Sequence, residues 1–571
     1  MKKSVFTIIF LGIILSIFYT GCSDVNEGYV EHSRRYGGTF RLSSPQYLNN
    51  LYPPHMNSQG AFKLGNQIYE GLVKIDKYDL VIQPALANNW MRSPDGKVYT
   101  FKLREDVYFQ NDPCFSDTIG RKLTAYDVEY SFYQICTYDP KNVGFAQTFQ
   151  DKVLGANQYF ELSKSGRPSI KIEGFKVIDN FTFQITLEKP FSPFLFYLAK
   201  PNALIFPYEA VWKYSKTMVS NAVGTGPFML ETIHSDQSVT LVRNPRYWKK
   251  DEDENQLPYL EKISVFFNEE EKNEFTSFKN GDLDFLSNVP KDFMDDVFDR
   301  EMKLTPQFSK YEIYKVNICL SVYFQMIITK KPFQDKRIRK AFNYAVDKNL
   351  LLEYIVGNTN YIPAIHGVSP PTFKNYKIEK INGYEYNPEL AEQLMAEAGY
   401  PNGVGFPVIK MVIVERGKNV AEAVAKMLED NLNIKIELQL APTFKDKIEN
   451  SKFGHADLYH AGWYADYPSP ENFLALFYGK DVPVDTLLPS YPNVTRYKNP
   501  VFDSLFNSAI HSADEGESYR LFLEAEQVMV DDAPIIMLYF PVYNTLANKN
   551  FVNLPMNPLS YFDFSDVYFK K

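Results

Sequence analysis

Hydrophobic side chains alternate with polar ones in several segments of the chain. Residues 99–104 (Tyr-Thr-Phe-Lys-Leu-Arg) and 181–187 (Phe-Thr-Phe-Gln-Ile-Thr-Leu) carry an apolar side chain at every second position. Successive side chains of a strand point to opposite faces of a sheet, so this pattern predicts two half-buried strands. Further along, the apolar run 408–414 precedes residues 419–431, which are amphipathic at helical spacing, and 434–440 alternates again. A strand–helix–strand unit is predicted there.

A similar unit is predicted about 150 residues earlier in the chain. Residues 262–267 are expected to form a strand, 269–279 a helix that Asn280-Gly281 ends, and 283–286 the next strand. Crossovers of this kind join parallel strands and are right-handed, so each unit predicts a parallel pair. Two α/β units so far apart indicate two lobes, and a cleft between lobes is a common place for a ligand.

Capping residues mark two further helices. Asp335 precedes residues 336–354, which are predicted as one helix with an apolar face. Its basic residues are expected on a solvated face: Lys336, Arg337, Arg339 and Lys340. Asn387 and Pro388 are expected to open a helix that Gly399 closes.

The N-terminus has the pattern of an export signal. Lys2 and Lys3 are followed by an apolar run over 5–19, which is shorter than the roughly 20 residues that a bilayer requires. Small residues then precede Cys22, and this resembles a bacterial lipobox, in which the cysteine is acylated. We therefore expect a signal peptide over 1–21 and a flexible tether over 22–35. The alternative is an ordinary secretory signal in which the cysteine is incidental.

Composition and missing motifs exclude several classes of function. The chain has 571 residues, a net charge of −8 and no long basic run, so nucleic-acid binding is not expected. It contains no phosphate-binding loop, no zinc-protease motif, no nucleophile elbow and no Cys-x-x-Cys pair. We therefore expect no enzyme activity, no metal and no cofactor. Three further cysteines could form one disulfide or remain buried thiols: Cys114, Cys136 and Cys319.

Short motifs spread along the chain, in order, resemble the family 5 extracellular solute-binding proteins over about residues 36–550. In the first part these are Gly37-Gly-Thr-Phe-Arg41, Ile68-Tyr-Glu-Gly-Leu72, Ser93-Pro-Asp-Gly96, Thr124-Ala-Tyr-Asp127, Gly224-Thr-Gly-Pro-Phe228 and Arg243-Asn-Pro-Arg-Tyr-Trp248. In the second part they are Asn280-Gly-Asp-Leu-Asp284, Pro332-Phe-Gln-Asp335 and Arg339-Lys-Ala-Phe-Asn-Tyr-Ala-Val-Asp347. Members of this family are the receptors of peptide and nickel ABC importers.

The resemblance implies an α/β architecture, the class II periplasmic-binding fold, with two lobes, a hinge and an extra α/β domain. A discontinuous lobe I is expected over 36–69, 190–315 and 540–571. The extra domain is expected over 70–189, and lobe II over 316–539.

The segment Ala461-Gly-Trp-Tyr-Ala-Asp-Tyr467 resembles the oligopeptide-binding branch most closely. In that branch the aspartate of this segment takes the α-ammonium of the peptide, which implies this role for Asp466. A fixed carboxylate in a closed cleft makes a strong charge-assisted hydrogen bond with an ammonium. Main chain near Gly462 can pair with a peptide like an added strand, independently of the peptide's sequence. Trp463, Tyr464 and Tyr467 are expected to supply apolar walls with polar tips.

Two positions depart from the family pattern. His460 stands where peptide receptors can carry an arginine that holds the ligand's carboxylate, which leaves the preferred peptide length open. Residues 51–55 (Leu-Tyr-Pro-Pro-His) replace the usual Leu-Asp-Pro. The residues just after them, including Ser58 and Gln59, are the expected contacts from the first lobe.

We therefore expect a binding protein that captures peptides between its lobes and delivers them to ABC permease subunits. It is expected to be a monomer at the periplasmic or cell surface, held to the membrane by a lipid anchor. A receptor for a nickel chelate, an oligosaccharide or another small solute is an alternative on the same scaffold. A surface hydrolase or a structural lipoprotein is a more remote one.

Overall fold

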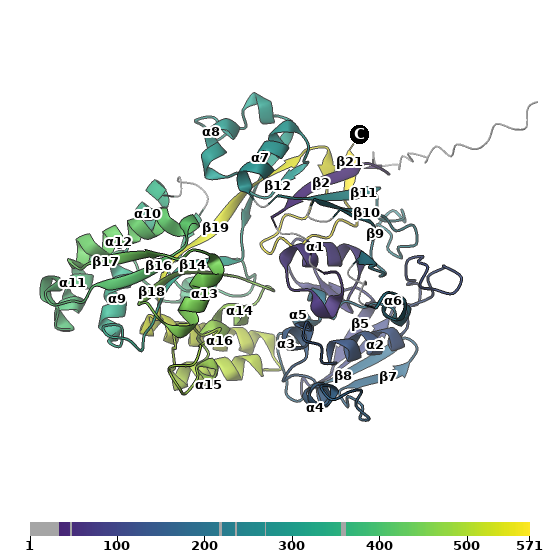
Figure 1. The fold of residues 1–571 in the computed structure, drawn as a ribbon, viewed down its shortest axis with the longest axis horizontal. Coiled ribbons are helices and arrows are strands. Elements are labelled where there is room, and N and C mark those ends of the chain that lie inside the picture. Colours follow the sequence, from purple (N-terminus) through teal and green to yellow (C-terminus); the bar gives the residue numbers. More distant parts are fainter. Residues whose placement is uncertain are drawn as a thin grey trace, which may run out of the picture.

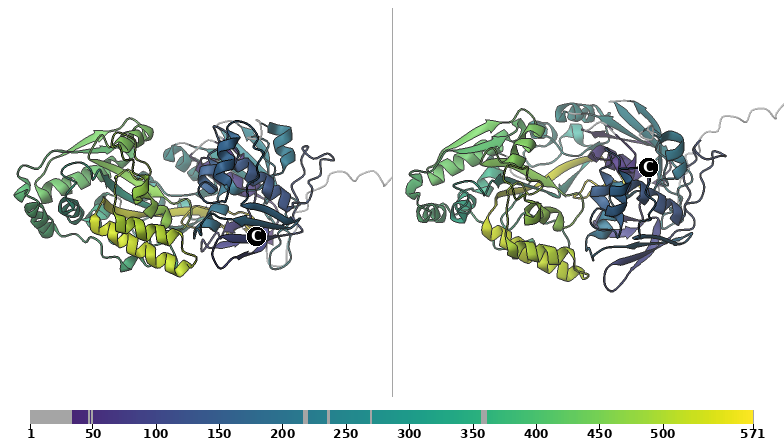
Figure 2. Two further views of the ribbon diagram at one scale, coloured as in Figure 1. Left: turned by 90° about the horizontal axis from the view of Figure 1, so that it is seen from below. Right: turned by 60° about the horizontal axis from the view of Figure 1, so that its bottom comes forward.

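The computed structural model describes residues 34–570 except 46–47, 49, 216–219, 235–236, 269 and 356–360. The expected signal peptide and Cys22 lie outside this range. Figure 1 shows two halves beside each other, and both views in Figure 2 separate the same two halves. The purple and blue half contains the start of the described chain and its C-terminal end, and the green half contains the middle of the chain.

Two sheets of the first half bring the two ends of the chain together. A four-stranded sheet has the order β2-β11-β10-β9, with β2 parallel to β11. Beside it, a three-stranded sheet has the order β1-β21-β20. The strands are β1 (Arg34–Arg35), β2 (Thr39–Ser44), β9 (Phe228–His234), β10 (Ser238–Arg243), β11 (Lys262–Phe267), β20 (Phe551–Val552) and β21 (Tyr568–Lys570). Helix α1 (Gln59–Ile68) packs against β9.

A further sheet of the first half contains the two strands predicted from alternation. Its order is β5-β6-β8-β7 and all neighbours are antiparallel. Strands β6 and β8 confirm the predictions at 99–104 and 181–187 to within one residue at each end. The sheet strands are β5 (Ala87–Arg92), β6 (Val98–Leu103), β7 (Phe175–Asp179) and β8 (Thr182–Thr186). Strands β3 (Val73–Ile75) and β4 (Ile82–Pro84) form a separate two-stranded antiparallel sheet. The helices of this region are α2 (Ala125–Ile135), α3 (Gly144–Thr148), α4 (Ala156–Ser163), α5 (Phe194–Leu198) and α6 (Tyr208–Tyr214).

The second half is built on an eight-stranded sheet. The path runs β12-β19-β14-β18-β16-β17, and β13 and β15 also pair with β19. Strands β16 and β17 are parallel and are joined by α12, which confirms the unit predicted over 408–440. The strands are β12 (Phe285–Leu286), β13 (Tyr311–Asn317), β14 (Leu320–Met326), β15 (Tyr361–Pro363), β16 (Ile409–Ile413), β17 (Ile436–Leu440), β18 (Leu458–Tyr464) and β19 (Ile535–Asn548).

Helices cover this sheet and enclose its own core. The fully buried side chains of Phe342, Met411 and Leu428 lie in that core. The remaining α-helices of the described residues are α7 (Glu271–Asn280), α8 (Met294–Val297), α9 (Lys336–Tyr344), α10 (Lys348–Ile355), α11 (Pro388–Glu397), α12 (Lys418–Leu432), α13 (Phe444–Phe453), α14 (Glu471–Leu474), α15 (Pro500–Ile510) and α16 (Glu515–Asp532). Helix α11 begins as predicted, because the Asn387 side chain accepts a hydrogen bond from the N–H of Leu390 at 3.0 Å. No helix in the described part of the chain is long and apolar enough to span a bilayer.

The long strand β19 links the two halves. Its first residues pair with β14 and β15, and its last residues pair with β13 and β12. Figure 1 shows this yellow strand running from the green half toward the purple half. The chain therefore crosses between the halves inside a continuous strand. The domain limits expected from the resemblance stay predictions.

Three expectations on local structure are wrong. Strand β11 pairs with β2 while β12 pairs antiparallel with β19, so residues 262–286 do not form a parallel strand–helix–strand unit within one sheet. The helix expected over 336–354 is two helices, α9 and α10, because the chain turns at residues 345–347. Arg339 is not solvated. It is 6% exposed, and its guanidinium donates to the carbonyl oxygens of Phe333 at 2.7 Å and Asp532 at 2.8 Å.

Candidate functional site

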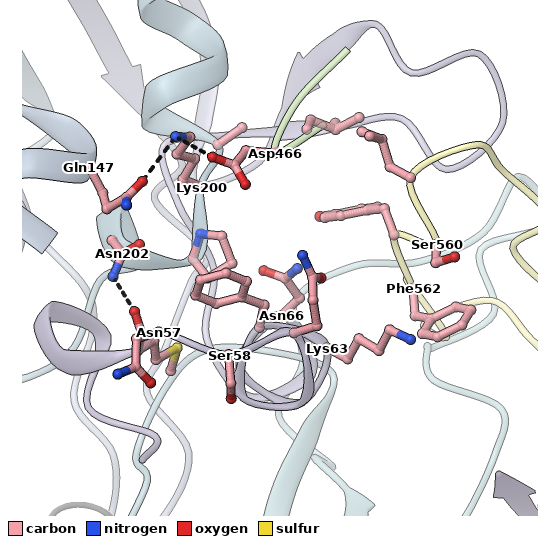
Figure 3. Close-up of a pocket in the computed structure, with 18 of the residues that line it drawn as sticks. Asn57, Ser58, Lys63, Asn66, Gln147, Lys200, Asn202, Asp466, Ser560 and Phe562 are labelled. Atoms are coloured by element: carbon pink, nitrogen blue, oxygen red, sulfur yellow. Dashed lines mark hydrogen bonds and ion pairs between the residues drawn. The ribbon is translucent and has the colours of Figure 1, made fainter. Parts of the chain in front are cut away.

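A cleft of ≈ 750 Å³ lies where segments distant in the sequence meet. One wall comes from residues 56–66, which include the start of α1, and another from residues 199–202. The C-terminal segment 559–562 closes a further side, and Ala465 and Asp466 reach the cleft from the second half. Figure 3 shows these side chains arranged around the open space.

Asp466 lies just beyond the end of β18 and faces this cleft. Its side chain is 42% exposed, and its Oδ2 lies 3.5 Å from Nζ of Lys200. The backbone N–H of Asp466 donates to Oδ1 of Asn472 at 3.3 Å, which fixes the main chain, while the carboxylate faces Lys200 and the cleft. The carboxylate is therefore placed to accept a hydrogen bond from a ligand.

Lys200 forms the floor beside this carboxylate. Its side chain is 8% exposed, and Nζ also donates to Oε1 of Gln147 at 3.4 Å. The ammonium lies 4.6 Å from the ring centroid of Tyr197 and 4.9 Å from that of Tyr467, which is the range of a cation–π contact. Burial lowers the pKa of Lys200, while Asp466 and Glu471 act in the opposite direction.

Tyr467 lies beneath the cleft rather than at its surface. It is 1% exposed, and its hydroxyl contacts the carboxylate of Glu471 and lies 3.2 Å from the hydroxyl of Tyr197. Its ring supports Lys200. A direct contact between Tyr467 and a ligand stays a prediction.

The predicted residues of β18 lie next to the cleft but do not line it in this structure. Trp463 donates from Nε1 to Oδ1 of Asn472 at 2.8 Å, and the hydroxyl of Tyr464 donates to Oγ of Ser560 at 3.2 Å. Gly462 is exposed and pairs with Val322 of β14. These side chains hold the strand against its surroundings, so their contribution to binding stays a prediction.

One edge of β18 is open beyond its second residue. Strand β16 pairs with β18 only at Leu458 and Tyr459, so in the described part of the chain no strand covers that edge from residue 460 to 464. The N–H of Ala465 donates to the carbonyl of Cys319, on the β14 side. Because an antiparallel strand directs its amides to alternate sides, the N–H and C=O of Gly462 and Tyr464 point toward the open edge.

His460 is a partly exposed residue whose Nε2 is buried. Its Nε2 has no hydrogen-bond partner in the described part of the protein, and Nδ1 lies so close to Gly417 that a Cβ there would come within 2.3 Å. Burial lowers the pKa of His460 to about 4, with a smaller effect from Lys447, whose Nζ donates to the His460 carbonyl at 2.7 Å. The ring is therefore uncharged at neutral pH and does not replace an arginine as a carboxylate partner.

This ring makes folding sensitive to mild acid. In the unfolded chain an imidazole has a pKa near 6.5. Between pH 6.5 and 4 the unfolded chain therefore binds more protons at this position than the folded protein does. We expect the free energy of unfolding to fall over that interval by at most about 3 kcal/mol. In His460→Gln this slope should be smaller, as measured by urea unfolding at successive pH values. His234→Gln, at the exposed end of β9, is the control and should keep the wild-type slope. Parallel curves for wild type and His460→Gln would contradict the expectation.

The first-lobe residues expected from the resemblance do line the cleft. Ser58 is the N-cap of α1, since its Oγ accepts a hydrogen bond from the N–H of Ala61 at 3.3 Å, and Gln59 begins the helix. One and two turns further along the same helix face lie Phe62, Lys63 and Asn66, which also line the cleft. Helical periodicity from Gln59 would have identified these three residues. For Lys200 the sequence contains no local signal.

Lys63 is a second cation of the cleft. Its Nζ lies 4.7 Å from the ring centroid of Phe562, and no carboxylate of the described residues lies within ion-pair distance. Burial lowers its pKa to about 8, and the more distant Glu274 opposes this. Figure 3 shows Lys63 and Phe562 across the cleft from Asp466.

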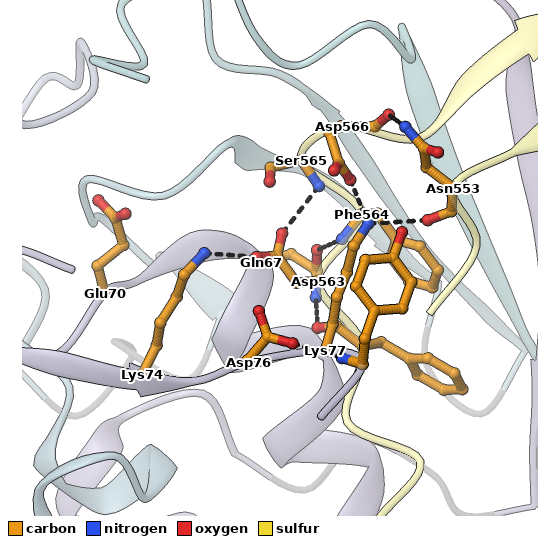
Figure 4. Close-up of polar contacts among 12 residues, drawn as sticks. Gln67, Glu70, Lys74, Asp76, Lys77, Asn553, Asp563, Phe564, Ser565 and Asp566 are labelled. Carbon is orange, nitrogen blue, oxygen red and sulfur yellow. Dashed lines mark hydrogen bonds and ion pairs between the residues drawn. The ribbon is translucent and has the colours of Figure 1, made fainter. Parts of the chain in front are cut away.

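The wall formed by residues 559–562 is held by polar contacts shown in Figure 4. Lys74 donates to Oδ2 of Asp563 at 2.7 Å, and both side chains are mostly buried. The Gln67 side chain donates to the carbonyl of Phe562 at 2.6 Å and accepts from the N–H of Phe564 at 3.2 Å. Burial raises the pKa of Asp563, but Lys74, Lys249 and Lys77 together hold it well below its usual value.

The three described cysteines, Cys114, Cys136 and Cys319, are free thiols, and no group of metal-ligating side chains occurs among the described residues. Cys22, the expected site of lipidation, lies outside the described range.

Comparisons with known proteins agree with this architecture. The model of the bacterial extracellular solute-binding proteins, family 5 Middle, matches residues 81–483. Heme-binding protein A of Haemophilus influenzae is 29% identical over 82% of this chain and 81% of that protein. Dipeptide-binding protein DppE of Bacillus subtilis is 27% identical over 90% of both chains. The solved structure of DppA from Helicobacter pylori in complex with the peptide STSA has a TM-score of 0.73, at 22% identity, and covers 95% of this chain and 99% of that one.

The family match covers most of the chain, and the solved structure agrees in fold over nearly all of it. This protein therefore belongs to the bacterial extracellular solute-binding proteins of family 5, and it is a non-enzymatic substrate-binding protein of an ABC importer with the α/β fold of the periplasmic peptide-binding proteins.

Proposed function

We propose that this protein captures short peptides in the cleft and delivers them to the permease of its importer. The observation that carries this proposal is the position of Asp466, whose half-exposed carboxylate faces a cleft of ≈ 750 Å³ between segments of both halves. A peptide offers an ammonium at one end and a regular series of N–H and C=O groups along its length. The carboxylate would accept the ammonium as a charge-assisted hydrogen bond.

The open edge of β18 supports recognition of the peptide main chain. An extended segment next to Gly462 and Tyr464 would add a strand there, and such pairing uses backbone groups alone. Side-chain selectivity would then arise from the cleft walls. The part of the affinity that comes from pairing with β18 should therefore not depend on the side chains of the peptide.

Closure of the two halves is the proposed signal to the permease. Strand β19 runs through both halves, so a bend within or beside it would change their relative orientation. A ligand shifts this equilibrium only if it binds the closed arrangement more tightly than the open one. Asp466 and Lys200 come from different halves, so a ligand that contacts both would bind the closed arrangement more tightly than the open one.

We further propose that the protein works as a lipid-anchored monomer outside the cytoplasm. Support comes from the basic and apolar N-terminal segment that ends at Cys22. Mass spectrometry of the intact protein from a membrane fraction tests this proposal. The expected result is an N-terminal cysteine that carries acyl chains.

Thermal shift with defined ligands tests the peptide assignment. A ligand present at about 100 times its dissociation constant stabilises the folded state by roughly 2.7 kcal/mol. We expect a mixed tripeptide library to raise the melting temperature, with heme, a nickel chelate and oligosaccharides as separate arms. A shift with one of those three and none with peptides would overturn the proposal. Heme is included because one relative is named for it.

A further inference from the structure

The carboxylate of Asp466 in the cleft already has a positively charged neighbour, the ammonium of Lys200. Lys200 lines the cleft and keeps 8% of its side chain exposed, and its Nζ lies 3.5 Å from Asp466 Oδ2 and 3.4 Å from Gln147 Oε1. The other faces of this ammonium lie over the rings of Tyr197 and Tyr467. These contacts fix its position, so the cleft presents a carboxylate and an ammonium next to each other rather than an isolated negative charge.

This arrangement has a consequence for the ligand. A peptide ammonium that binds Asp466 also approaches Lys200, and the two like charges repel each other in a partly desolvated site. A carboxylate attached to the same carbon as the ligand's ammonium would instead face Lys200. Two opposite charges on the ligand would then match two opposite charges on the protein.

The net charge of the side chains that line the cleft also favours a ligand with an additional carboxylate. Among the residues that line it, the charged side chains are Lys63 and Lys200 on the positive side and Asp466 on the negative side, which gives a net charge of +1. A ligand with two carboxylates and one ammonium has the complementary net charge of −1. Its second carboxylate would reach Lys63, across the cleft from Asp466.

We propose that the cleft selects short peptides whose amino end carries an ammonium and a free carboxylate on one carbon, as in γ-linked glutamyl peptides. Lys200 is then a specificity residue that binds the carboxylate on this carbon, and Asp466 binds the ammonium. This inference rests on the proposed function, because it names the kind of peptide that the same site prefers.

Two isomeric tripeptides test the inference on the unmodified protein. γ-Glu-Ala-Gly and α-Glu-Ala-Gly have the same composition and net charge, and differ in whether a carboxylate lies next to the ammonium. Isothermal titration should give at least tenfold tighter binding of the γ-linked isomer, which corresponds to one charge-assisted hydrogen bond. Ala-Ala-Gly, without the extra carboxylate, should bind no better than the α-linked isomer.

A variant then assigns the preference to Lys200. In Lys200→Met the preference for the γ-linked isomer should fall below about threefold, and Ala-Ala-Gly should bind at least as tightly as before. The matched control is Lys189→Met, which removes an exposed lysine from the same region and should keep the tenfold preference. Melting curves of both variants establish that they are folded.

The outcomes separate this inference from the proposed function. Equal binding of the two isomers, or tighter binding of the α-linked one, overturns the inference while peptide binding stands. An unchanged preference in folded Lys200→Met overturns the role of Lys200. If neither isomer, nor Ala-Ala-Gly, nor the mixed library binds, the peptide assignment fails and the inference fails with it.

Discussion

Replacing Asp466 by asparagine is expected to weaken peptide binding at least tenfold. A hydrogen bond between charged groups contributes about 1.5–3 kcal/mol, and about 1.4 kcal/mol corresponds to a factor of ten in affinity. The variant loses that bond and also removes the only carboxylate that lines the cleft in the described structure. Lys200 would then repel the incoming ammonium without compensation. The loss can therefore approach a hundredfold.

Isothermal titration with a tripeptide measures this effect, and the fold is checked separately. The carboxylate of Asp466 is 42% exposed, so asparagine should fit without disturbing the packing. Glu422→Gln is the matched control, because it removes one exposed negative charge from the same half of the molecule. It should leave the affinity within about twofold. Unchanged binding by Asp466→Asn would mean that the ammonium is recognised elsewhere.

Replacing Asp563 by asparagine is expected to destabilise the protein by about 3 kcal/mol. Lys74 and Asp563 are 21% and 16% exposed, so the variant leaves a mostly buried ammonium without its nearest counter-charge. The lost contact also anchors residues 559–562, which form a wall of the cleft. We therefore expect lower stability together with weaker ligand binding, although Asp563 itself does not line the cleft.

The pH dependence of this effect distinguishes a charge from a packing defect. Because the pKa of Asp563 is held below its value in the unfolded chain, its stabilisation is complete above pH 4 and is lost as the pH falls further. Urea unfolding should show the full difference between wild type and variant at pH 7 and a smaller one near pH 3. Asp292→Asn, an exposed carboxylate without a bound partner in the described contacts, is the control and should change stability by less than about 0.5 kcal/mol. A difference that does not vary with pH would contradict the charge explanation.

The sequence predicted features that depend on nearby residues. Alternation located β6 and β8, and helical spacing between two apolar strands located β16, α12 and β17. Asn387 and Pro388 marked the start of α11 correctly. These predictions were correct because the spacing of buried side chains and the capping of helices depend on residues only a few positions apart.

The same reasoning failed where partners are distant in sequence. Residues 262–286 have the pattern of a parallel unit, but the second strand, β12, pairs with β19 near the other end of the chain. The basic residues after Asp335 have the pattern of a solvated face, yet Arg339 is buried because the carbonyls of Phe333 and Asp532 satisfy its guanidinium. A pattern cannot reveal which strand or carbonyl the fold brings alongside.

Some residues of the candidate site could be identified from the sequence, and others only from the tertiary structure. Asp466, Ser58 and Gln59 could be identified by family resemblance, and all three line the cleft. By itself the sequence thus determined the fold class, the family and one wall of the site. Only the tertiary structure placed Lys200 beside Asp466, and Asp563 beside Lys74, which is 489 positions away. The charge that a ligand meets is the sum over side chains from several remote segments, and that sum exists only once the chain has folded.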